Sequence, residues 1–528
     1  MTLLADRPGG AATGPRQWWE RRWFVAILVL IAAVPLLYPD VPPLVDLLGH
    51  LGRYRVQLDL DQSPWLGRYY DFQWAVIGNL GVDLLIIPLR PLFGLEPSVK
   101  LVVLAIPPLT VGGFLWVARE VHHRLPPTAL FALPFAFSFP FQFGFANFTL
   151  AMALAMIAFG FWLHLGERNR DRLRAVLFVP ISVVVFFTHA FGWGTLGLLC
   201  FSAEAVRQHD RGTGWFRAGV RAALHASVML LPVLFMAMWR SGAASQRTFG
   251  WFNWDLKWEW VYSALRDRWE IFDIGTIVLL GIVVLFAIFH RRLEISRNLF
   301  FSALVLAAAF VLLPWTIFGS AYADMRIVPY TMAIALLAIR FKGPTDLPLA
   351  GRLAGIALTL FLVRLAGTTA SLAIAANDQE EKLRALDHVP MGAAVVNLAG
   401  ERCADRWGLP RDSHLGAMAI VRRHAFSNDQ WAIEGANLLK VRFDEAAPFM
   451  TDPSQMVRSP DCMRNLRTID EALAAIPEGA FNYVWLIDTP SHDPALTGGW
   501  VPVWRGRDSV LYATSPQAAD AARREKGS

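Results

Sequence analysis

The sequence is built from apolar blocks of about twenty residues, each long enough to cross a lipid bilayer as an α-helix. Hydrophobic side chains occupy 55% of the 528 positions, and charged side chains only 17%. The basic residues are not spread evenly, because they gather in short loops between the blocks. This pattern predicts a polytopic α-helical membrane protein.

Arginine-rich loops indicate how the chain is oriented, because such loops stay on the cytoplasmic side of a membrane. The N-terminal tail, residues 1–22, is basic at its end, so the first block at 23–38 is expected to leave the cytoplasm. Five further basic loops follow, at residues 119–124, 167–174, 207–221, 290–297 and 340–352. The formal net charge of +6 therefore reflects membrane topology and does not indicate nucleic-acid binding.

An even number of crossings must separate neighbouring cytoplasmic loops. This rule conflicts with the number of apolar blocks at one place, in and after the first outer loop, residues 39–97. Of the two apolar blocks at 74–93 and 99–117, only one can cross. The first block contains several polar residues and two prolines: Asn79, Asp83, Arg90, Pro88 and Pro91. Such groups are costly in a lipid-facing span, so we expect an interfacial or re-entrant helix there. The membrane domain, residues 23–374, then crosses about eleven times, at the usual length per span.

The first outer loop also contains a helical pattern in which polar side chains share one face. Asp46, His50, Arg53 and Gln57 stand at i, i+4, i+7 and i+11, and leucines form a second stripe. An amphipathic helix on a membrane surface, with its polar face in water, would have this pattern. The alternative is a catalytic face, because a carboxylate, an imidazole and a guanidinium offer a base, a proton carrier and an anion clamp. The clustering of titratable groups favours the catalytic interpretation.

Further polar residues are expected on the same, extracytoplasmic side: Asp40, Asn79, Asp83, Gln142, Asn147, His189, Asp324 and Arg326. Each has an ordinary explanation on its own. Asp40 can cap a helix, His189 can be satisfied within its turn, and Asp324 can neutralise the nearby Arg326. Positive-inside sorting places arginines, however, and does not explain why acidic residues and histidines converge on one side. We therefore treat these residues as candidates for a functional site.

A tryptophan-rich loop at residues 249–260 is expected on the same side. Trp251, Trp254 and Trp258 share a helical face. Tryptophan at the headgroup level is a common interface anchor, and this is the simpler interpretation. The alternative is a rim that guides a lipid tail or stacks on a sugar ring.

Residues 375–528 have the composition of a soluble domain, which the topology places outside the cytoplasm. Segments 393–398, 483–487 and 509–512 are predicted to be short strands, and segment 464–476 a helix. A small α/β domain is the natural inference.

Two of the three cysteines, Cys403 and Cys462, lie in this C-terminal domain. An oxidising compartment favours a disulfide between them, although two unrelated buried thiols are the alternative. Cys200 lies within a predicted span and is expected to stay a free thiol. The spacing of the three cysteines does not indicate a zinc site.

This layout resembles the GT-C superfamily of integral-membrane glycosyltransferases. Its members have a catalytic Asp or Glu in the first outer loop, followed by two juxtamembrane helices, the second ending in a Phe-Gly step. Here the acidic residue corresponds to Asp46 or Asp40, and the step to Phe93-Gly94. The pattern Pro-Leu-Val-Asp-x3-His-Leu-x-Arg is similar to that of uncharacterised bacterial multi-span proteins with a GT-C-like layout. That group shares further features: Asn79 with Asp83, the step at 144–148, and Asp324 with Arg326.

The resemblance implies a glycosyltransferase at the periplasmic face of a bacterial inner membrane. A polyprenyl-phosphate-linked sugar is the expected donor, because nucleotide sugars are not available there, and the acceptor would be an envelope glycan, lipid or protein. The general base is assigned to Asp46, with Asp40 as the alternative and His50 beside it. The cations assigned to the departing phosphate are Arg53, Arg326 and His189. The supporting residues are Asn79, Asp83, Asn147 and Asp324.

Metal-dependent members of the superfamily carry acidic residues in the second outer loop, whereas residues 139–149 contain none. We therefore expect neither a divalent metal nor another cofactor. Two other classes of function stay open. A lipid-glycan flippase or transporter would be expected to show internal repeats and polar sites at the bilayer midplane. A non-catalytic subunit of a polysaccharide assembly system would keep the fold without the activity.

Overall fold

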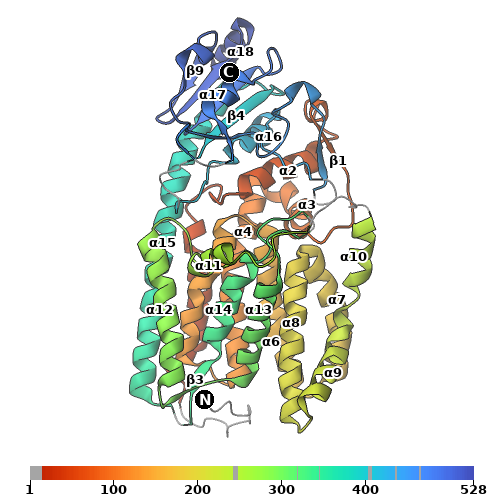
Figure 1. Cartoon of the computed structure of the whole chain (residues 1–528), viewed down its shortest axis with the longest axis vertical. Helices are drawn as coiled ribbons and strands as arrows, with labels where there is room; N and C mark the ends of the chain where they lie inside the picture. The colour runs from red at the N-terminus through yellow and green to blue at the C-terminus, as the bar shows by residue number, and fades with distance from the viewer. Residues whose placement is uncertain are drawn as a thin grey trace. The chain divides into compact units, whose positions relative to one another are not determined.

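The computed structural model describes residues 15–241, 248–317, 319–343, 345–401, 407–433, 437–462 and 465–527. They belong to two compact units, and many of their helices and strands are labelled in Figure 1. The first unit comprises Met1–Tyr38, Val76–Leu84 and Leu101–Ala370. The second comprises Pro39–Ala75, Leu85–Lys100 and Ser371–Ser528.

Helices make up nearly all of the first unit. Its α-helices, three of which continue into the second unit, are α1 (Arg22–Ile31), α3 (Gly81–Phe93), α4 (Leu95–His122), α5 (Phe139–Gln142), α6 (Ala146–Glu167), α7 (Asp171–Thr188), α8 (Ala190–Asp210), α9 (Trp215–Ala226), α10 (Pro232–Ser241), α11 (Trp254–Tyr262), α12 (Glu270–Phe289), α13 (Arg297–Leu312), α14 (Val328–Leu337) and α15 (Leu347–Leu383). The 3-10 helices are η1 (Trp18–Glu20), η2 (Val34–Leu36), η4 (Pro127–Phe137), η5 (Ser227–Met229) and η6 (Met325–Ile327). Two of the predicted basic loops contain short strands, β2 (Leu293–Ile295) and β3 (Ile339–Phe341), which pair antiparallel.

Among the described residues, four helices are long and apolar enough to cross a membrane: Leu95–His122, Ala146–Glu167, Glu270–Phe289 and Leu347–His388. A bent pair, Trp215–Met229 with Pro232–Trp239, raises this number to five if it counts as one span. The predicted eleven crossings are therefore not confirmed. One reason is that proline interrupts several apolar blocks. Pro35 follows the ten-residue α1, and Pro314 follows the sixteen-residue α13.

The apolar block at 74–93 is not one long helix. Only α3 is helical there, and it has 13 residues. At 1.5 Å per residue it is about 20 Å long, shorter than the roughly 30 Å of a bilayer core. Pro88 and Pro91 lie inside it. Its length agrees with the expectation that this block does not cross the membrane.

The second unit is organised around a six-stranded mixed sheet with the strand order β7-β6-β4-β8-β10-β9. Its strands are β4 (Val395–Gly400), β6 (Met456–Arg458), β7 (Arg467–Thr468), β8 (Tyr483–Ile487), β9 (Val501–Arg505) and β10 (Ser509–Ala513). β7, β6, β4 and β8 pair in parallel, whereas β10 runs antiparallel to β8 and β9. β4, β8 and β10 overlap the three predicted strands, and each contains β-branched or aromatic residues.

The helices of the second unit are short. They are α2 (Leu47–Asp59), η3 (Leu66–Arg68), η7 (Arg384–His388), η8 (Leu415–Ala417), α16 (Met418–Arg423), η9 (Asp444–Ala446), α17 (Ile469–Ala474), η10 (Pro494–Thr497) and α18 (Pro516–Gly527). The predicted helix at 464–476 is shorter in the structure: residue 464 lies outside the described residues, β7 occupies 467–468, and α17 covers 469–474. Thr468 then starts α17 with a capping box to Glu471.

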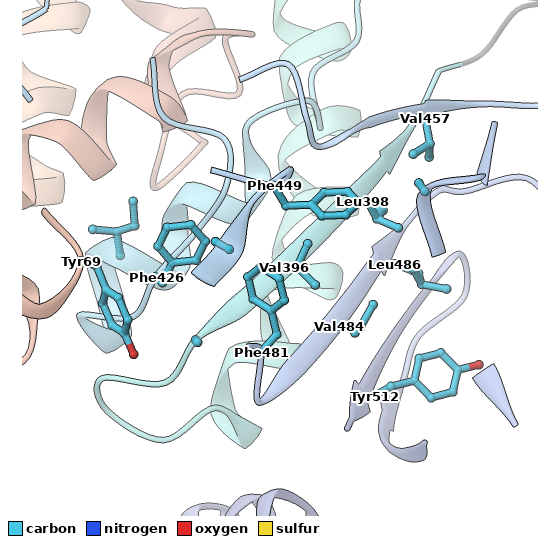
Figure 2. Packing of buried hydrophobic residues seen from close by; sticks show 14 of the residues in the cluster. Tyr69, Val396, Leu398, Phe426, Phe449, Val457, Phe481, Val484, Leu486 and Tyr512 are labelled. Atoms are coloured by element: carbon cyan, nitrogen blue, oxygen red, sulfur yellow. The ribbon is translucent and has the colours of Figure 1, made fainter. Parts of the chain in front are cut away.

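The first outer loop packs with the C-terminal residues in this second unit. β1 (Tyr70–Phe72) pairs antiparallel with β5 (Leu439–Val441), with Tyr70 opposite Val441. Tyr69 lies in the same buried cluster as Phe426 and Val396 (Figure 2). The predicted domain boundary at residue 375 thus separates the first outer loop from the C-terminal residues, although the two segments form one core.

The described cysteines differ in their chemical state. Cys200 is a buried free thiol, as expected. Cys462 is disulfide-bonded. Cys403 lies outside the described residues, so its pairing with Cys462 stays a prediction.

Candidate active site

Asp46 stands at the start of α2, the helix that the polar stripe predicts. Its backbone carbonyl accepts from the His50 N–H at 3.0 Å, while its side chain does not cap the helix. The side chain of Asp46 is 16% exposed. Asp40, the alternative base, is exposed to solvent.

The polar face of α2 does not lie in water, as the surface-helix interpretation required. Arg53 is 5% exposed, and its guanidinium carbon lies 4.7 Å from the ring centre of Tyr54. Helix α2 packs instead against η8 and α16. Two glycines allow the approach. A Cβ atom at Gly49 would lie 2.7 Å from the Trp431 ring, and one at Gly52 would lie 2.8 Å from Gln430 Nε2.

A histidine from the C-terminal segment faces the Asp46 carboxylate. His414 Nε2 lies 3.9 Å from Asp46 Oδ1 and 3.9 Å from Asp452 Oδ1. The other ring nitrogen, Nδ1, is 3.1 Å from the backbone carbonyl of Asp429. Burial lowers the pKa of His414, while the Asp452 charge and the Asp429 carbonyl oppose this effect.

Trp431 lies beside both histidines of this group. Its ring centre is 4.4 Å from that of His414 and 5.0 Å from that of His50. Burial, followed by the charges of Arg53 and His414, lowers the pKa of His50 well below its ordinary value. His50 Nδ1 is buried and has no hydrogen-bond partner among the described residues. His50 is thus neutral near pH 7, which does not suit a cationic role.

Sequence reasoning missed His414, Asp452, Asp429 and Trp431. These residues follow the last apolar block, and local sequence patterns do not show that this part of the chain contacts the first outer loop. A usable signal was present. The segment Ser427-Asn428-Asp429-Gln430-Trp431 groups polar side chains that are not typical of a buried core, yet residues 427–430 are buried here.

In the first unit, the structure brings together three of the residues assigned a supporting role, Asn79, Asp83 and Asn147. Asn147 Nδ2 donates to Asn79 Oδ1 at 3.0 Å and to Asp83 Oδ2 at 3.1 Å. Asn147 Oδ1 accepts from the Val82 N–H at 2.6 Å. These bonds join the start of α3 to α6, so their evident effect is to position the helices.

His189 and Arg326 also meet in the first unit. The Phe191 N–H donates to His189 Nδ1 at 3.1 Å, so the proton of a neutral ring belongs on Nε2. That nitrogen lies 3.3 Å from Arg326 Nη1. Arg326 also donates to Ser320 Oγ at 3.2 Å, and its guanidinium carbon is 4.4 Å from the ring centre of Phe145. Two donor groups therefore face each other beside aromatic rings.

Asp324 does not neutralise Arg326, which corrects the simple interpretation of their spacing. Its carboxylate pairs with Lys257 at 3.0 Å, with the two side chains 1% and 2% exposed. Lys257 Nζ also donates to the carbonyls of Phe310 and Leu313, at 2.8 and 2.9 Å. Lys257 belongs to α11, within the tryptophan-rich loop, and the sequence pattern gave no reason to choose it.

No family model matches the sequence, and no curated protein is similar to it. The fold, however, is similar to two crystal structures of ArnT from Cupriavidus metallidurans. The apo structure is matched with a TM-score of 0.52 and 14% identity, over 94% of this chain and 98% of that chain. The chain has the ArnT fold. The second structure, ArnT bound to undecaprenyl phosphate, is matched with a TM-score of 0.51 and 12% identity over the same shares.

ArnT is a GT-C family protein, so the GT-C resemblance inferred from the first outer loop is confirmed for the fold. The apolar helices and the ArnT fold also identify the chain as a membrane protein. The Pro-Leu-Val-Asp-x3-His-Leu-x-Arg pattern itself is not tested by this likeness.

Proposed function

We propose that this protein is a membrane glycosyltransferase that takes a sugar from a polyprenyl-phosphate carrier at the periplasmic face. The observation that carries the proposal is the ArnT fold over 94% of the chain, one ArnT structure being bound to undecaprenyl phosphate. The cluster around Asp46 supports it, because sugar transfer to a hydroxyl group needs a positioned base.

In the proposed reaction, the acceptor hydroxyl oxygen attacks the anomeric carbon of the donor sugar. The bond from that carbon to the phosphate oxygen breaks, and its electron pair leaves with the polyprenyl phosphate. Asp46 takes the hydroxyl proton. The 16% exposure of its side chain suits this role, since a base must reach its substrate yet be shielded from bulk water.

His189 and Arg326 are proposed to bind the phosphate of the donor. The His189 Nε2–H and the Arg326 guanidinium are both donors, 3.3 Å apart. Two donors at this distance are stabilised by an anion that accepts from both. The proposal assigns no metal to this step. Among the described residues, no group of three or more His, Cys, Asp or Glu side chains is arranged to hold a metal ion, and metal independence stays a prediction.

The proposal is tested with purified protein in lipid nanodiscs and a polyprenyl-phosphate sugar donor. Asp46→Asn is expected to lower the transfer rate by roughly 10²–10⁴-fold, the usual loss for a general base. Binding of undecaprenyl phosphate and the melting temperature should stay near wild type. Asp61→Asn, an exposed acid after α2, is the matched control.

Asp40→Asn is measured alongside. Loss of transfer in this variant, with Asp46→Asn active, would move the base to Asp40. A wild-type protein that binds undecaprenyl phosphate but transfers no sugar to any envelope acceptor would contradict the proposal. That outcome would favour a lipid-glycan transporter or a non-catalytic assembly subunit.

A further inference from the structure

His414 lies between two carboxylates, and all three groups belong to the second unit. Asp46 comes from the start of α2, His414 from the residue before η8, and Asp452 from the loop before β6. The side chain of His414 is 6% exposed, that of Asp46 is 16% and that of Asp452 is 23%. Exposure thus increases from the histidine toward both acids.

The tautomer of His414 follows from its backbone contact. A carbonyl oxygen only accepts hydrogen bonds, so the 3.1 Å contact with the Asp429 carbonyl places a proton on Nδ1. In a neutral ring, Nε2 then carries a lone pair, and this nitrogen faces the two acids. An imidazolium formed by protonation of Nε2 would be stabilised by both carboxylates.

Burial and the charged and titratable groups around His414 together determine its pKa. Burial favours the neutral ring, and it lowers the pKa of His414 despite the Asp452 charge. His50 on α2 is held neutral by its own burial. Burial also raises the pKa of Asp429 to about 7, so this carboxyl adds little negative charge below that pH.

We propose that His414 is a positioning residue that relays the proton away from Asp46, with Asp452 as the exit. This inference rests on the proposed function for its first step. After Asp46 takes the hydroxyl proton, side-chain rotation closes the 3.9 Å gap to hydrogen-bond distance, and an N–H bond forms at His414 Nε2 as the Asp46 O–H bond breaks. The proton then passes to Asp452 and from there to water. The carboxylate of Asp46 is restored without the proton returning along the path of the substrate.

Asp452 is held in place for this step. Gln455 Nε2 donates to Asp452 Oδ1 at 2.8 Å. The same Oδ1 atom lies 3.9 Å from His414 Nε2. Gln455 is buried, so its amide is a fixed donor that orients the Asp452 carboxyl group beside His414.

The first test measures proton sharing without using activity. The chain contains 12 histidines, and labelling with [13Cε1]histidine gives each one a signal that responds to pH. The His414 signal is assigned from its absence in His414→Asn, whose amide nitrogen can replace Nδ1 as the donor to the Asp429 carbonyl. In Asp46→Asn and in Asp452→Asn, the pKa of His414 should fall by about one pH unit or more, since each variant removes a nearby opposite charge.

Asp61→Asn is the control, and the His414 titration should be unchanged in it. An unchanged titration in Asp46→Asn or in Asp452→Asn would overturn the inference. Because this test uses the full-length protein without substrates, its result does not depend on whether sugar transfer is found.

The second test uses activity. His414→Gln keeps a polar atom near the position of Nε2 but cannot take up a proton. We therefore expect kcat to fall about tenfold or more, and the acidic limb of the pH profile of kcat to shift. The KM for the donor should be unchanged. A merely structural role would instead change KM and the melting temperature together. Wild-type transfer combined with an unaltered kcat and pH profile in His414→Gln would overturn the relay while leaving the proposed function intact. Absence of wild-type transfer would count against the proposed function, and the titration would still decide whether the proton is shared.

Discussion

At the scale of single residues, Asp429 is an acid whose protonation follows from its burial. The Ser427 hydroxyl lies 2.8 Å from Asn397 Oδ1 and 2.9 Å from Asp429 Oδ1. A hydrogen bond from the Ser427 hydroxyl favours the ionised form of Asp429 and so lowers the pKa of this carboxyl, but burial opposes that effect. Burial, the largest cause, raises its pKa to about 7.

The protonation of Asp429 predicts a pH dependence of stability. Between its ordinary value of 3.8 and its folded pKa of about 7, the folded state holds a proton that the unfolded chain has released. The free energy of unfolding therefore falls as pH rises through this window and levels off above it. Asp429→Asn, which resembles the protonated acid, should flatten this slope and stabilise the protein at pH 8 by up to about 4 kcal/mol.

Thermal unfolding at pH 5 and pH 8 measures this effect, with the exposed Asp444→Asn as a matched control. If the stability of Asp429→Asn differs between pH 5 and pH 8 as much as that of the wild type, a group other than Asp429 causes the pH dependence.

The second prediction for single residues concerns His189 and Arg326, the two donors proposed to bind the donor phosphate. Arg326→Gln should weaken binding of undecaprenyl phosphate by about 10- to 100-fold, the cost of a lost charge-assisted hydrogen bond. Arg352→Gln, an exposed arginine in the same unit, should bind as wild type does. Binding is measured by native mass spectrometry, and transfer is measured with and without EDTA. Activity that disappears in EDTA and returns with Mn²⁺ or Mg²⁺ would show that a metal holds the phosphate.

At the scale of elements, helix α2 is defined by how closely it approaches η8 and α16. The two glycines on its packed face differ in what a methyl group would meet. At Gly52 the nearest atom is the end of the flexible Gln430 side chain. At Gly49 the nearest atoms belong to the Trp431 ring, at 2.7 and 2.9 Å, and to His414 Nδ1, at 3.1 Å. Rigid rings cannot move aside without disturbing the groups around Asp46.

Gly49→Ala is therefore expected to destabilise the protein by about 1–3 kcal/mol, the usual cost of overpacking, despite the better helix propensity of alanine. It should also reduce transfer, because it displaces His414 and Trp431. Gly67→Ala is the control, since a Cβ there has open space. Thermal unfolding of the purified variants decides the matter. Equal stability of Gly49→Ala and Gly67→Ala would mean that the packing of α2 at Gly49 leaves room for a methyl group.

At the scale of the whole molecule, the second unit joins segments from both ends of the chain. The disulfide of Cys462 adds a covalent link within it. We predict Cys403 as its partner, which closes a loop of about sixty residues and stabilises the fold by roughly 4 kcal/mol in the chain-entropy model. Non-reducing mass spectrometry of protein from an oxidising periplasm should find the linked peptide, with Cys200 as a free thiol. Free thiols at 403 and 462 that react only with cytoplasmic reagents would reverse the predicted orientation.

The sequence by itself determined the features that depend on local pattern. Apolar blocks indicated a helical membrane protein, and short apolar segments located β4, β8 and β10. A helical period placed Asp46, His50 and Arg53 on one face of α2. The first-loop layout indicated the GT-C fold, which the likeness to ArnT confirms. These features follow from periods of two and 3.6 residues, which are visible within a single segment.

Only the tertiary structure decided what each face contacts. The polar face of α2 meets a loop from the other end of the chain, where Arg411 donates to the Pro43 carbonyl across 368 residues. Asp324 finds Lys257, 67 residues away, in preference to the nearby Arg326. Local periodicity shows that a face is polar but not whether water or another segment covers it. That outcome depends on packing and on burying each charge beside a partner, which the whole fold settles at once.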